Sequence, residues 1–218
     1  MSIKNFKLSR PITSYGKVQG LVAKAIRGNT FFINRQSIKD KVMLNVGCGP
    51  CPLDEFINLD YFWSPKIDIC WDIVGKPYPL EDNSLEGIFT EHCLEHIPFE
   101  SCLANLKEFY RMLKPNGTLR IVVPDGELYC DLYQQRKSNS GVQFPYGESE
   151  ETGMISINRI FRIHGHLFIY DYETFELHLR NAGFSKIKKQ KFRNGSDSRL
   201  LVDLEDRAIE SLYVEAVK

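Results

Sequence analysis

The stretch Lys41-Val-Met-Leu-Asn-Val-Gly-Cys-Gly-Pro50 is an apolar run that ends at two closely spaced glycines. A buried strand of a parallel sheet is typically a continuous run of Val, Leu and Ile rather than an alternating one. Glycine tolerates the backbone angles of a tight turn and lets the main chain come close to a ligand. The stretch therefore predicts a buried parallel strand followed by a ligand-binding turn at residues 47–49.

A second short apolar run, Phe56-Ile-Asn-Leu, follows after a brief connection and ends in Asp60. The order of strand, glycine turn, strand and acidic residue is the skeleton of a nucleoside-binding α/β half-domain. In such a half-domain the carboxylate accepts hydrogen bonds from ribose hydroxyl groups. The sequence therefore predicts a nucleoside site in which Asp60 binds the ribose.

Length and charge limit the classes to which the protein can belong. A chain of 218 residues is the size of one α/β domain, with or without a small appendage. Its 28 basic and 28 acidic residues balance, so the chain as a whole favours neither nucleic acid nor an anionic membrane as its partner. The charge is unevenly spread, because residues 1–39 hold eight Lys and Arg residues and no acid.

The apolar segments of the sequence favour a cytoplasmic protein. No apolar stretch approaches the about 18–20 residues that a membrane-spanning helix needs, and the N-terminus lacks the apolar segment of a signal peptide. We therefore expect no membrane span. In the cytoplasm the six cysteines are expected to be reduced, and most of them to be buried as small apolar groups.

Apolar periodicity and turn residues divide the chain into alternating strands and helices. We expect helices over residues 18–26, 99–114, 127–135 and 171–181, and strands over residues 41–46, 56–60, 66–72, 85–90, 118–123, 186–192 and 212–217. Strands that alternate with helices form a mainly parallel sheet with helices on both faces. The expected fold is therefore an α/β, doubly wound sheet of seven strands.

Two segments lie outside this regular alternation. Residues 1–40 are expected to form an N-terminal cap that contains the first, basic helix, and residues 41–218 to form the main domain. Residues 136–170 begin with a polar stretch rich in Gly and Ser that is long for a compact domain. We expect this insertion to act as a lid or as a substrate-binding loop.

Two motifs near the glycine turn suggest other chemistry, and each lacks a required part. A dinucleotide fingerprint needs a third glycine for the pyrophosphate, but Pro52 occupies that position. Cys48 and Cys51 have the spacing of a redox dithiol, which depends on a long helix that begins at the cysteines. A strand follows too soon for such a helix, so we favour neither NAD nor redox chemistry.

Two histidine pairs suggest a metal site. His92 and His96, in the pattern His-x-x-Glu-His, resemble an inverted zinc-protease motif. That motif needs a sustained helix and a distant carboxylate ligand, whereas Pro98 ends the segment almost at once. The second pair, His164 and His166, flanks Gly165 in an expected loop. Taken one pair at a time, the sequence predicts no metal site.

Several stretches that occur in order along residues 41–218 together resemble the class I S-adenosylmethionine-dependent methyltransferases. The resemblance is closest to a small bacterial branch of the family with a shortened first crossover. It rests on Leu44-Asn-Val-Gly-Cys-Gly49, Phe56-Ile-Asn-Leu-Asp60, Pro79-Leu-Glu-Asp-Asn-Ser84, Glu91-His-Cys-Leu-Glu-His96, Leu106-Lys-Glu-Phe-Tyr-Arg-Met-Leu-Lys-Pro-Asn-Gly117 and Leu119-Arg-Ile-Val-Val-Pro-Asp125.

The resemblance implies a Rossmann-like sheet whose last strand is antiparallel, with a cofactor site at the strand ends. The methionine part of S-adenosylmethionine would lie over the glycine turn. Asp60 would bind the ribose, Asp72 the adenine amine, and Glu91 and His92 would face the transferring methyl group. The implied cofactor-binding residues are Asn45, Gly47, Cys48, Gly49, Asp60, Asp72, Glu91 and His92.

The chain departs from the family pattern in two ways. The first strand carries Asn45 where the family usually has an acidic residue, which weakens any charge contact with the ammonium group of the cofactor. The connection from Gly49 to Asp60 is also too short for a full crossover helix. Asp68 is therefore an alternative ribose ligand.

A sulfonium methyl group is already activated, so an in-line arrangement of nucleophile and methyl at about 3 Å supplies much of the rate. An oxygen nucleophile gains further from a general base. Strand-end and loop positions make His92, His166 and Asp125 the candidate catalytic residues. His92 is the first choice, because a histidine can accept a proton near neutral pH.

The sequence therefore predicts S-adenosylmethionine-dependent methyl transfer, with O-methylation of a small molecule or a saccharide precursor as the preferred reaction. The basic segment 1–39 keeps an RNA or protein methyltransferase open as an alternative, although no further basic stripe or RNA-binding motif follows, which disfavours nucleic acid. A cofactor-binding protein without catalysis is the third hypothesis, because Asn45 replaces the usual acid. Assembly into a homo-oligomer is left open.

Overall fold

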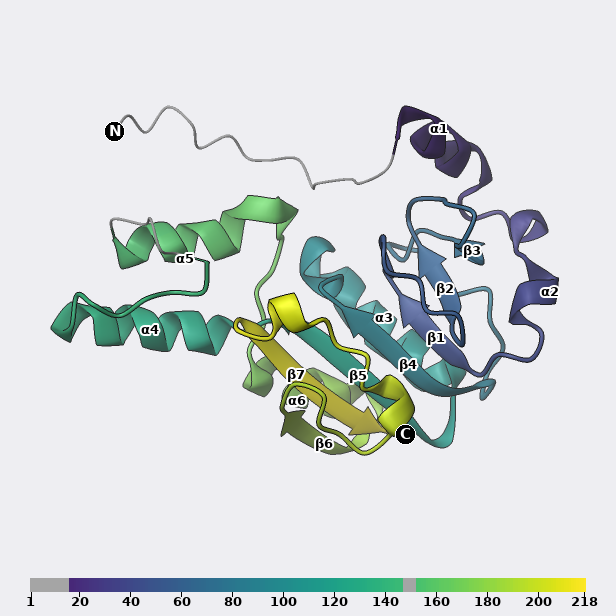
Figure 1. Cartoon of the computed structure of the whole chain (residues 1–218). Coiled ribbons are helices and arrows are strands. Elements are labelled where there is room, and N and C mark those ends of the chain that lie inside the picture. Colours follow the sequence, from purple (N-terminus) through teal and green to yellow (C-terminus); the bar gives the residue numbers. More distant parts are fainter. Residues whose placement is uncertain (1–15, 147–151) are drawn as a thin grey trace.

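The computed structural model describes residues 16–146 and 152–218. Their centre is a sheet of seven strands in the order β3-β2-β1-β4-β5-β7-β6 (Figure 1). The strands are β1 (Met43–Val46), β2 (Ile57–Asp60), β3 (Ile69–Cys70), β4 (Leu85–Glu91), β5 (Leu113–Pro124), β6 (Ser185–Gln190) and β7 (Ser211–Val217). Strands β1 to β5 pair in parallel, whereas β7 is antiparallel to both of its neighbours. The predicted mainly parallel seven-stranded sheet with an antiparallel last strand is confirmed.

Helices and short 3-10 turns connect the strands. The α-helices are α1 (Lys17–Ile26), α2 (Arg35–Ile38), α3 (Phe99–Met112), α4 (Gly126–Ser138), α5 (Gly153–Arg162) and α6 (Tyr172–Ala182). The 3-10 turns are η2 (Thr30–Phe32), η3 (Leu94–His96), η4 (Ile163–Gly165), η5 (Ser198–Leu200) and η6 (Glu205–Arg207). Every helix within the described residues is too short or too polar to cross a membrane.

The two faces of the sheet are covered differently. On one face, α3 and α6 bury apolar side chains such as Phe109 and Phe175 against the main core. On the other face, Leu200 of η5 packs over β1 and β4 together with Met43 and Phe89. Because this loop replaces a helix there, the residues after β6 lie close to the carboxyl end of β4.

The structure corrects several predicted boundaries. The third strand is only the two residues of β3, rather than residues 66–72, because Asp68 and Asp72 on either side bind neighbouring main-chain N–H groups. Within the expected insertion 136–170, α5 is a helix that the sequence reading missed. Thr152 caps it by accepting a hydrogen bond from the N–H group of Ile155.

Helices α4 and α5 lie side by side and extend away from the sheet (Figure 1). A small separate core joins them, formed by Tyr129, Phe144 and Ile160. The side chain of Tyr146 then reaches back from this segment to the main-chain carbonyl of Asp206. The two helices therefore lie beside the strand ends; of the two, only α5 lies wholly within the predicted insertion 136–170, whose role as a lid or substrate loop stays a prediction.

The predicted cap is described only from residue 16 onward, so residues 1–15 lie outside the described residues. Helix α1 forms where the apolar periodicity predicts it. Its predicted apolar face is largely open, however, with Val18 72% and Leu21 69% exposed. Hydrogen bonds from Gly28 to Cys70 and from Asn34 to Asp68 hold the following segment against β3.

Candidate functional site

The carboxyl ends of β1, β2, β4 and β5 meet at one edge of the sheet, as they must in a parallel arrangement. Gly47, Asp60, Glu91 and Asp125 lie at or directly after these ends. Ligands of open α/β sheets bind in the crevice outside this edge. The structure therefore places the residues predicted from four separate stretches of sequence along a single edge.

The glycine turn after β1 needs glycine at two positions for different reasons. Gly47 and Gly49 have φ angles of 67° and 53°, in the left-handed region that L side chains rarely adopt. A Cβ atom at Gly47 would lie 2.3 Å from the Sγ atom of Cys93, so the core excludes any larger residue there. A Cβ atom at Gly49 would meet nothing closer than the Gly47 carbonyl oxygen at 4.0 Å. The main chain at Gly49 is therefore open to an approaching ligand.

Asp60 links the end of β2 to the glycine turn. Its carboxylate accepts hydrogen bonds from the N–H groups of Gly49 at 2.8 Å and Phe62 at 2.7 Å. Burial raises the pKa of Asp60, and these hydrogen bonds and the nearby guanidinium of Arg27 work against that rise. Arg27 stacks over the ring of Tyr61 and donates to its carbonyl oxygen at 2.7 Å. The segment after α1 thus lies against the ribose-binding position expected for Asp60.

Asn45 and Asp68 are occupied by internal hydrogen bonds. The Asn45 amide donates to the side chain of Asn58 at 3.3 Å and to the carbonyl of Cys51 at 3.4 Å, which fixes the glycine turn. Asp68 accepts from the Asn58 N–H group at 2.8 Å and from the Ser37 hydroxyl at 2.5 Å. Both oxygens of Asp68 accept hydrogen bonds from within the fold, as do both oxygens of Asp60, but only Asp60 bonds directly to the glycine turn, through the N–H group of Gly49.

Cys48 after β1 and Asp72 after β3 are two further residues predicted to bind the cofactor. Cys48 is buried, and desolvation raises the pKa of its thiol far above the usual range. A buried thiol of this kind is a poor nucleophile and a poor redox group. Asp72 is half-buried and accepts a hydrogen bond from the N–H group of Val74 at 2.9 Å.

Glu91 and His92 end β4. The Glu91 carboxylate accepts a hydrogen bond from the N–H group of Leu204 at 3.0 Å, and burial raises its pKa. His92 has a φ angle of 47°, and its Nε2 atom lies 2.9 Å from the Ser211 hydroxyl. Burial lowers the pKa of the His92 ring to about 2. The ring is therefore neutral near pH 7 and does not titrate there, which removes the reason for which it was preferred as a base.

The other two predicted catalytic residues lie in different surroundings. Asp125 caps α4 by accepting a hydrogen bond from the Leu128 N–H group at 3.3 Å, and its carboxylate lies 3.5 Å from Nζ of Lys189. These contacts give Asp125 a structural use in capping α4. His166 follows η4 and does lie close to the end of β4.

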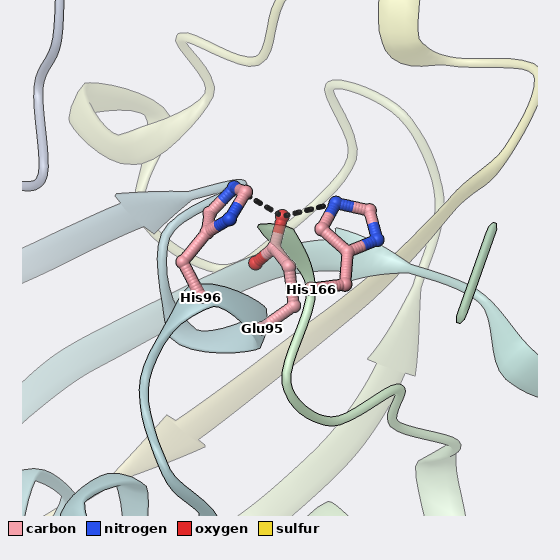
Figure 2. A group of neighbouring side chains, drawn as sticks. All are labelled: Glu95, His96 and His166. Carbon is pink, nitrogen blue, oxygen red and sulfur yellow. Dashed lines mark ion pairs between the residues drawn. The ribbon is translucent and has the colours of Figure 1, made fainter. Parts of the chain in front are cut away.

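A histidine cluster surrounds Glu95, whose side chain is fully buried. Figure 2 shows Glu95 with two of these histidines, His96 and His166. The Oε1 atom of Glu95 lies 3.5 Å from Nδ1 of His92, 3.7 Å from Nε2 of His96 and 4.0 Å from Nε2 of His166. Burial raises the pKa of Glu95 to about 8 and lowers the pKa of His166 to about 4. The sequence reading missed this cluster because it weighed the pairs 92/96 and 164/166 separately, whereas the fold brings the two pairs together.

Two clefts meet at this edge of the sheet. The smaller, of about 170 Å³, runs along the glycine turn and includes Glu91 and Leu204 in its lining. The larger, of about 570 Å³, is lined by Pro50, His92, His96, Tyr146, Arg159, Ile160, His164, His166, Asp206, Arg207 and Glu210. Pro50, His92 and Arg207 line both clefts. Arg207 comes from η6, near the end of the chain, and no local sequence signal indicated it.

Comparison with known proteins supports the fold. A family model described as a methyltransferase domain matches residues 68–121. The solved structure of a SAM-dependent methyltransferase from Archaeoglobus fulgidus superposes with a TM-score of 0.54 at 17% sequence identity, over 92% of this chain and 94% of that chain. The chain has a class I methyltransferase fold.

Other similar structures have lower scores. One is a SAM-dependent methyltransferase from Thermotoga maritima, a possible histamine N-methyltransferase, with a TM-score of 0.48 and 17% identity over 91% of this chain and 92% of that one. Another is the Burkholderia thailandensis 1,6-didemethyltoxoflavin-N1-methyltransferase, with a TM-score of 0.49 and 14% identity over 90% and 76% of the two chains. No protein with a curated description matches this methyltransferase-fold chain in sequence.

Proposed function

We propose that the protein transfers a methyl group from S-adenosylmethionine to a hydroxyl oxygen of a small molecule or saccharide precursor. The observation that carries this proposal is the meeting of two clefts at His92. One cleft runs along the glycine turn, and the other is large enough for an acceptor. A transferase needs such an arrangement, because donor and acceptor atoms have to meet in line at about 3 Å.

The residues along the first cleft fit S-adenosylmethionine. This cofactor has no pyrophosphate, so the open main chain at Gly49 is sufficient and a third glycine is unnecessary. Glu91 in this cleft would hold the methionine end, whereas Asp60 at the end of β2 and Asp72 after β3, which lie outside its lining, would hold the ribose and the adenine amine. When bound, S-adenosylmethionine supplies a methyl group that its sulfonium has already activated. The task left to the chain is to position the acceptor and to exclude water.

The larger cleft has the size and polarity of a small-molecule site. Its volume of about 570 Å³ lies within the range of about 300–1,000 Å³ that is usual for such sites. Arg207, Asp206 and Glu210 give it charges of both signs, and the histidines add further polar groups. A hydroxylated acceptor such as a sugar can form hydrogen bonds with these groups, whereas a wholly apolar acceptor would leave them unpaired.

Calorimetry with S-adenosylhomocysteine tests the cofactor part of the proposal. Replacing Asp60 with alanine removes a charge-assisted hydrogen bond, which is worth about 1.5–3 kcal/mol. The expected result is a Kd about 10- to 150-fold weaker than that of the wild type. Asp54→Ala is the matched control, because it removes an exposed carboxylate from the same connection between β1 and β2. Equal affinity of wild type and Asp60→Ala would move the ribose contact elsewhere.

Transfer of labelled methyl groups tests the acceptor part. We expect incorporation into at least one member of a panel of nucleotide sugars and small hydroxylated compounds. Incorporation into RNA or protein and into none of the small compounds would favour the alternative that the basic segment 1–39 suggests. Tight binding of S-adenosylhomocysteine without transfer to any acceptor would instead indicate a binding protein without catalysis.

A further inference from the structure

The cluster around Glu95 combines residues that are distant in sequence and arranged around one point. Glu95 and His96 lie in η3, and His166 directly follows η4. One ligand atom from each residue lies within 4.8 Å of the other two. Both imidazole rings point toward the same carboxylate oxygen (Figure 2). Three side chains thus present potential metal ligands to a common centre.

The carboxylate at this centre is buried without the partners that it needs. The side chain of Glu95 has no exposed surface. Neither of its oxygens accepts a hydrogen bond from another residue within the described ranges, 16–146 and 152–218. Burying a carboxylate is costly unless it is paired or coordinates a metal ion. Imidazole nitrogens of His92, His96 and His166 lie 3.5 to 4.0 Å from the Oε1 atom of this carboxylate.

The hydrogen bonds behind the rings turn lone pairs toward Glu95. The Nδ1 atom of His166 lies 2.7 Å from the carbonyl oxygen of Ile160, which can only accept, so Nδ1 carries the proton. Its Nε2 atom then presents a lone pair to Glu95. The same argument applies to His92, because the Ser211 hydroxyl donates to the Arg207 carbonyl and must accept from Nε2 of His92. Lone pairs and a carboxylate face one another, and either a proton on Glu95, whose pKa is raised by burial, or a cation between the groups resolves this conflict.

The main chain holds these groups in place without help from a ligand. The N–H groups of Leu167 and Phe168 donate to the Glu95 carbonyl oxygen at 2.7 and 3.3 Å, which ties η3 to the segment after η4. His164 and Gly165 have φ angles of 63° and 80° and turn the chain so that His166 faces Glu95. A proton donated from behind the ring to a main-chain carbonyl is the usual support of a metal-binding histidine.

We propose that Glu95, His96 and His166 bind a divalent transition-metal ion. Two imidazoles and one carboxylate form the donor set of open, catalytic-type zinc sites, with bonds of about 2.0–2.2 Å. Bonds of that length place tetrahedral ligands about 3.4 Å apart, close to the separations of 3.7 and 4.0 Å from Glu95 to the two histidines. Magnesium and calcium prefer oxygen ligands, so the nitrogen-rich set favours zinc.

The ion would adjoin the acceptor cleft, because His96 and His166 line it. Its remaining positions are open to the Nδ1 atom of His92 or to an oxygen ligand from the cleft. One further step rests on the proposed function: this oxygen belongs to the acceptor hydroxyl group. The metal ion then acts as a Lewis acid and lowers the pKa of that hydroxyl group. The site would thereby supply the activation that a neutral His92 does not. The metal site itself stands independently of that step.

Titration of the chelator-treated full-length protein with Zn²⁺ in a calorimeter, and with Co²⁺ in a spectrophotometer, tests the proposal. The expected result is one equivalent bound, with the intense visible absorption of tetrahedral Co²⁺. Glu95→Gln and His166→Ala should each weaken binding by more than about 100-fold, since even outer-shell changes cost about 10–100-fold. His178→Ala on α6 removes a histidine outside the cluster and should bind as the wild type does.

Absence of stoichiometric binding in the wild type would overturn the proposal, as would wild-type affinity in Glu95→Gln or His166→Ala. Should Glu95→Gln fail to fold, His96→Ala takes its place with the same expected loss. S-adenosylhomocysteine binding, measured on the same samples, separates the two proposals. Cofactor binding without metal binding would overturn only the metal site, whereas metal binding without cofactor binding would overturn only the proposed function.

Discussion

The surroundings of each cysteine thiol decide its chemistry. Cys48, Cys70 and Cys102 are buried, whereas Cys51 and Cys130 are exposed. Desolvation raises the pKa of Cys48 beyond the usual range and that of Cys102 to about 11. Since the thiolate is the reactive form, burial suppresses the reactivity of these groups. The Cys48 and Cys51 pair therefore lacks the activated thiol that a redox dithiol requires.

Alkylation of the native protein with iodoacetamide at pH 8 should distinguish these thiols. We expect modification of Cys51 and Cys130, and protection of Cys48, Cys70 and Cys102 until denaturant is added, because the protected sulfurs are buried and un-ionised. Peptide mass spectrometry of quenched samples measures the extent at each site. Modification of Cys48 as fast as that of Cys51 would show that the glycine turn opens in solution.

At the scale of an element, the turn between β1 and β2 depends on Gly47 more than on Gly49. Both positions have positive φ, where a residue with a side chain costs about 1–2 kcal/mol. Only Gly47 also faces the Cys93 side chain, at 2.3 Å from a built Cβ atom. Overpacking of this kind adds about 1–3 kcal/mol.

Gly47→Ala should therefore lower the free energy of unfolding by about 2–5 kcal/mol, and Gly49→Ala by about 1–2 kcal/mol. The difference arises because a methyl group at Gly49 enters open space. Urea unfolding followed by circular dichroism measures both variants. Equal losses in the two variants would mean that the contact with Cys93 relaxes without cost.

Local sequence patterns predicted those elements whose signals are contiguous. The first strand, its glycine turn and Asp60 follow from a short stretch, because a buried parallel strand and a left-handed turn each impose residue types locally. Helix α5 was missed, since its capping residue Thr152 follows an acidic, polar stretch with loop-like composition. The short β3 was overextended, because alternating apolar residues do not reveal which main-chain groups find strand partners.

The sequence predicted which residues lie at the strand ends near the glycine turn, but not which residues line the larger cleft. Gly47, Asp60 and Glu91 each directly follow or end a strand, so a strand prediction places them at one edge. Arg207 and the pairing of Glu95 with His166 join segments far apart in the chain. Contacts between such distant segments depend on how α5, η4 and η6 pack. A pattern within one stretch of sequence therefore cannot predict them.

At the scale of the whole molecule, one buried ion cluster holds the C-terminal loop against the sheet. Arg120 of β5 is fully buried and donates to Asp203 at 2.5 and 2.7 Å and to Glu215 of β7 at 3.0 Å. Asp203 immediately precedes Leu204, whose N–H group binds the carboxylate of Glu91. The same loop contributes Val202 and Leu204 to the smaller cleft. The Arg120 cluster therefore couples the stability of the sheet to the shape of the site.

Arg120→Met tests this coupling, because methionine fills much of the same space while leaving two buried carboxylates without their cation. Breaking a buried pair by removing one partner costs about 3–5 kcal/mol. The free energy of unfolding measured in urea should therefore fall by that amount. Arg199→Ala is the control: its ion pairs with Asp197 and Glu86 are on the surface, where a pair contributes about 0–1 kcal/mol.

Because Asp203 positions Leu204, Arg120→Met should also weaken S-adenosylhomocysteine binding at temperatures where the variant stays folded. Unchanged ligand affinity together with the expected loss of stability would show that the loop keeps its position without the cluster, and that Glu91 alone holds Leu204 beside the glycine turn.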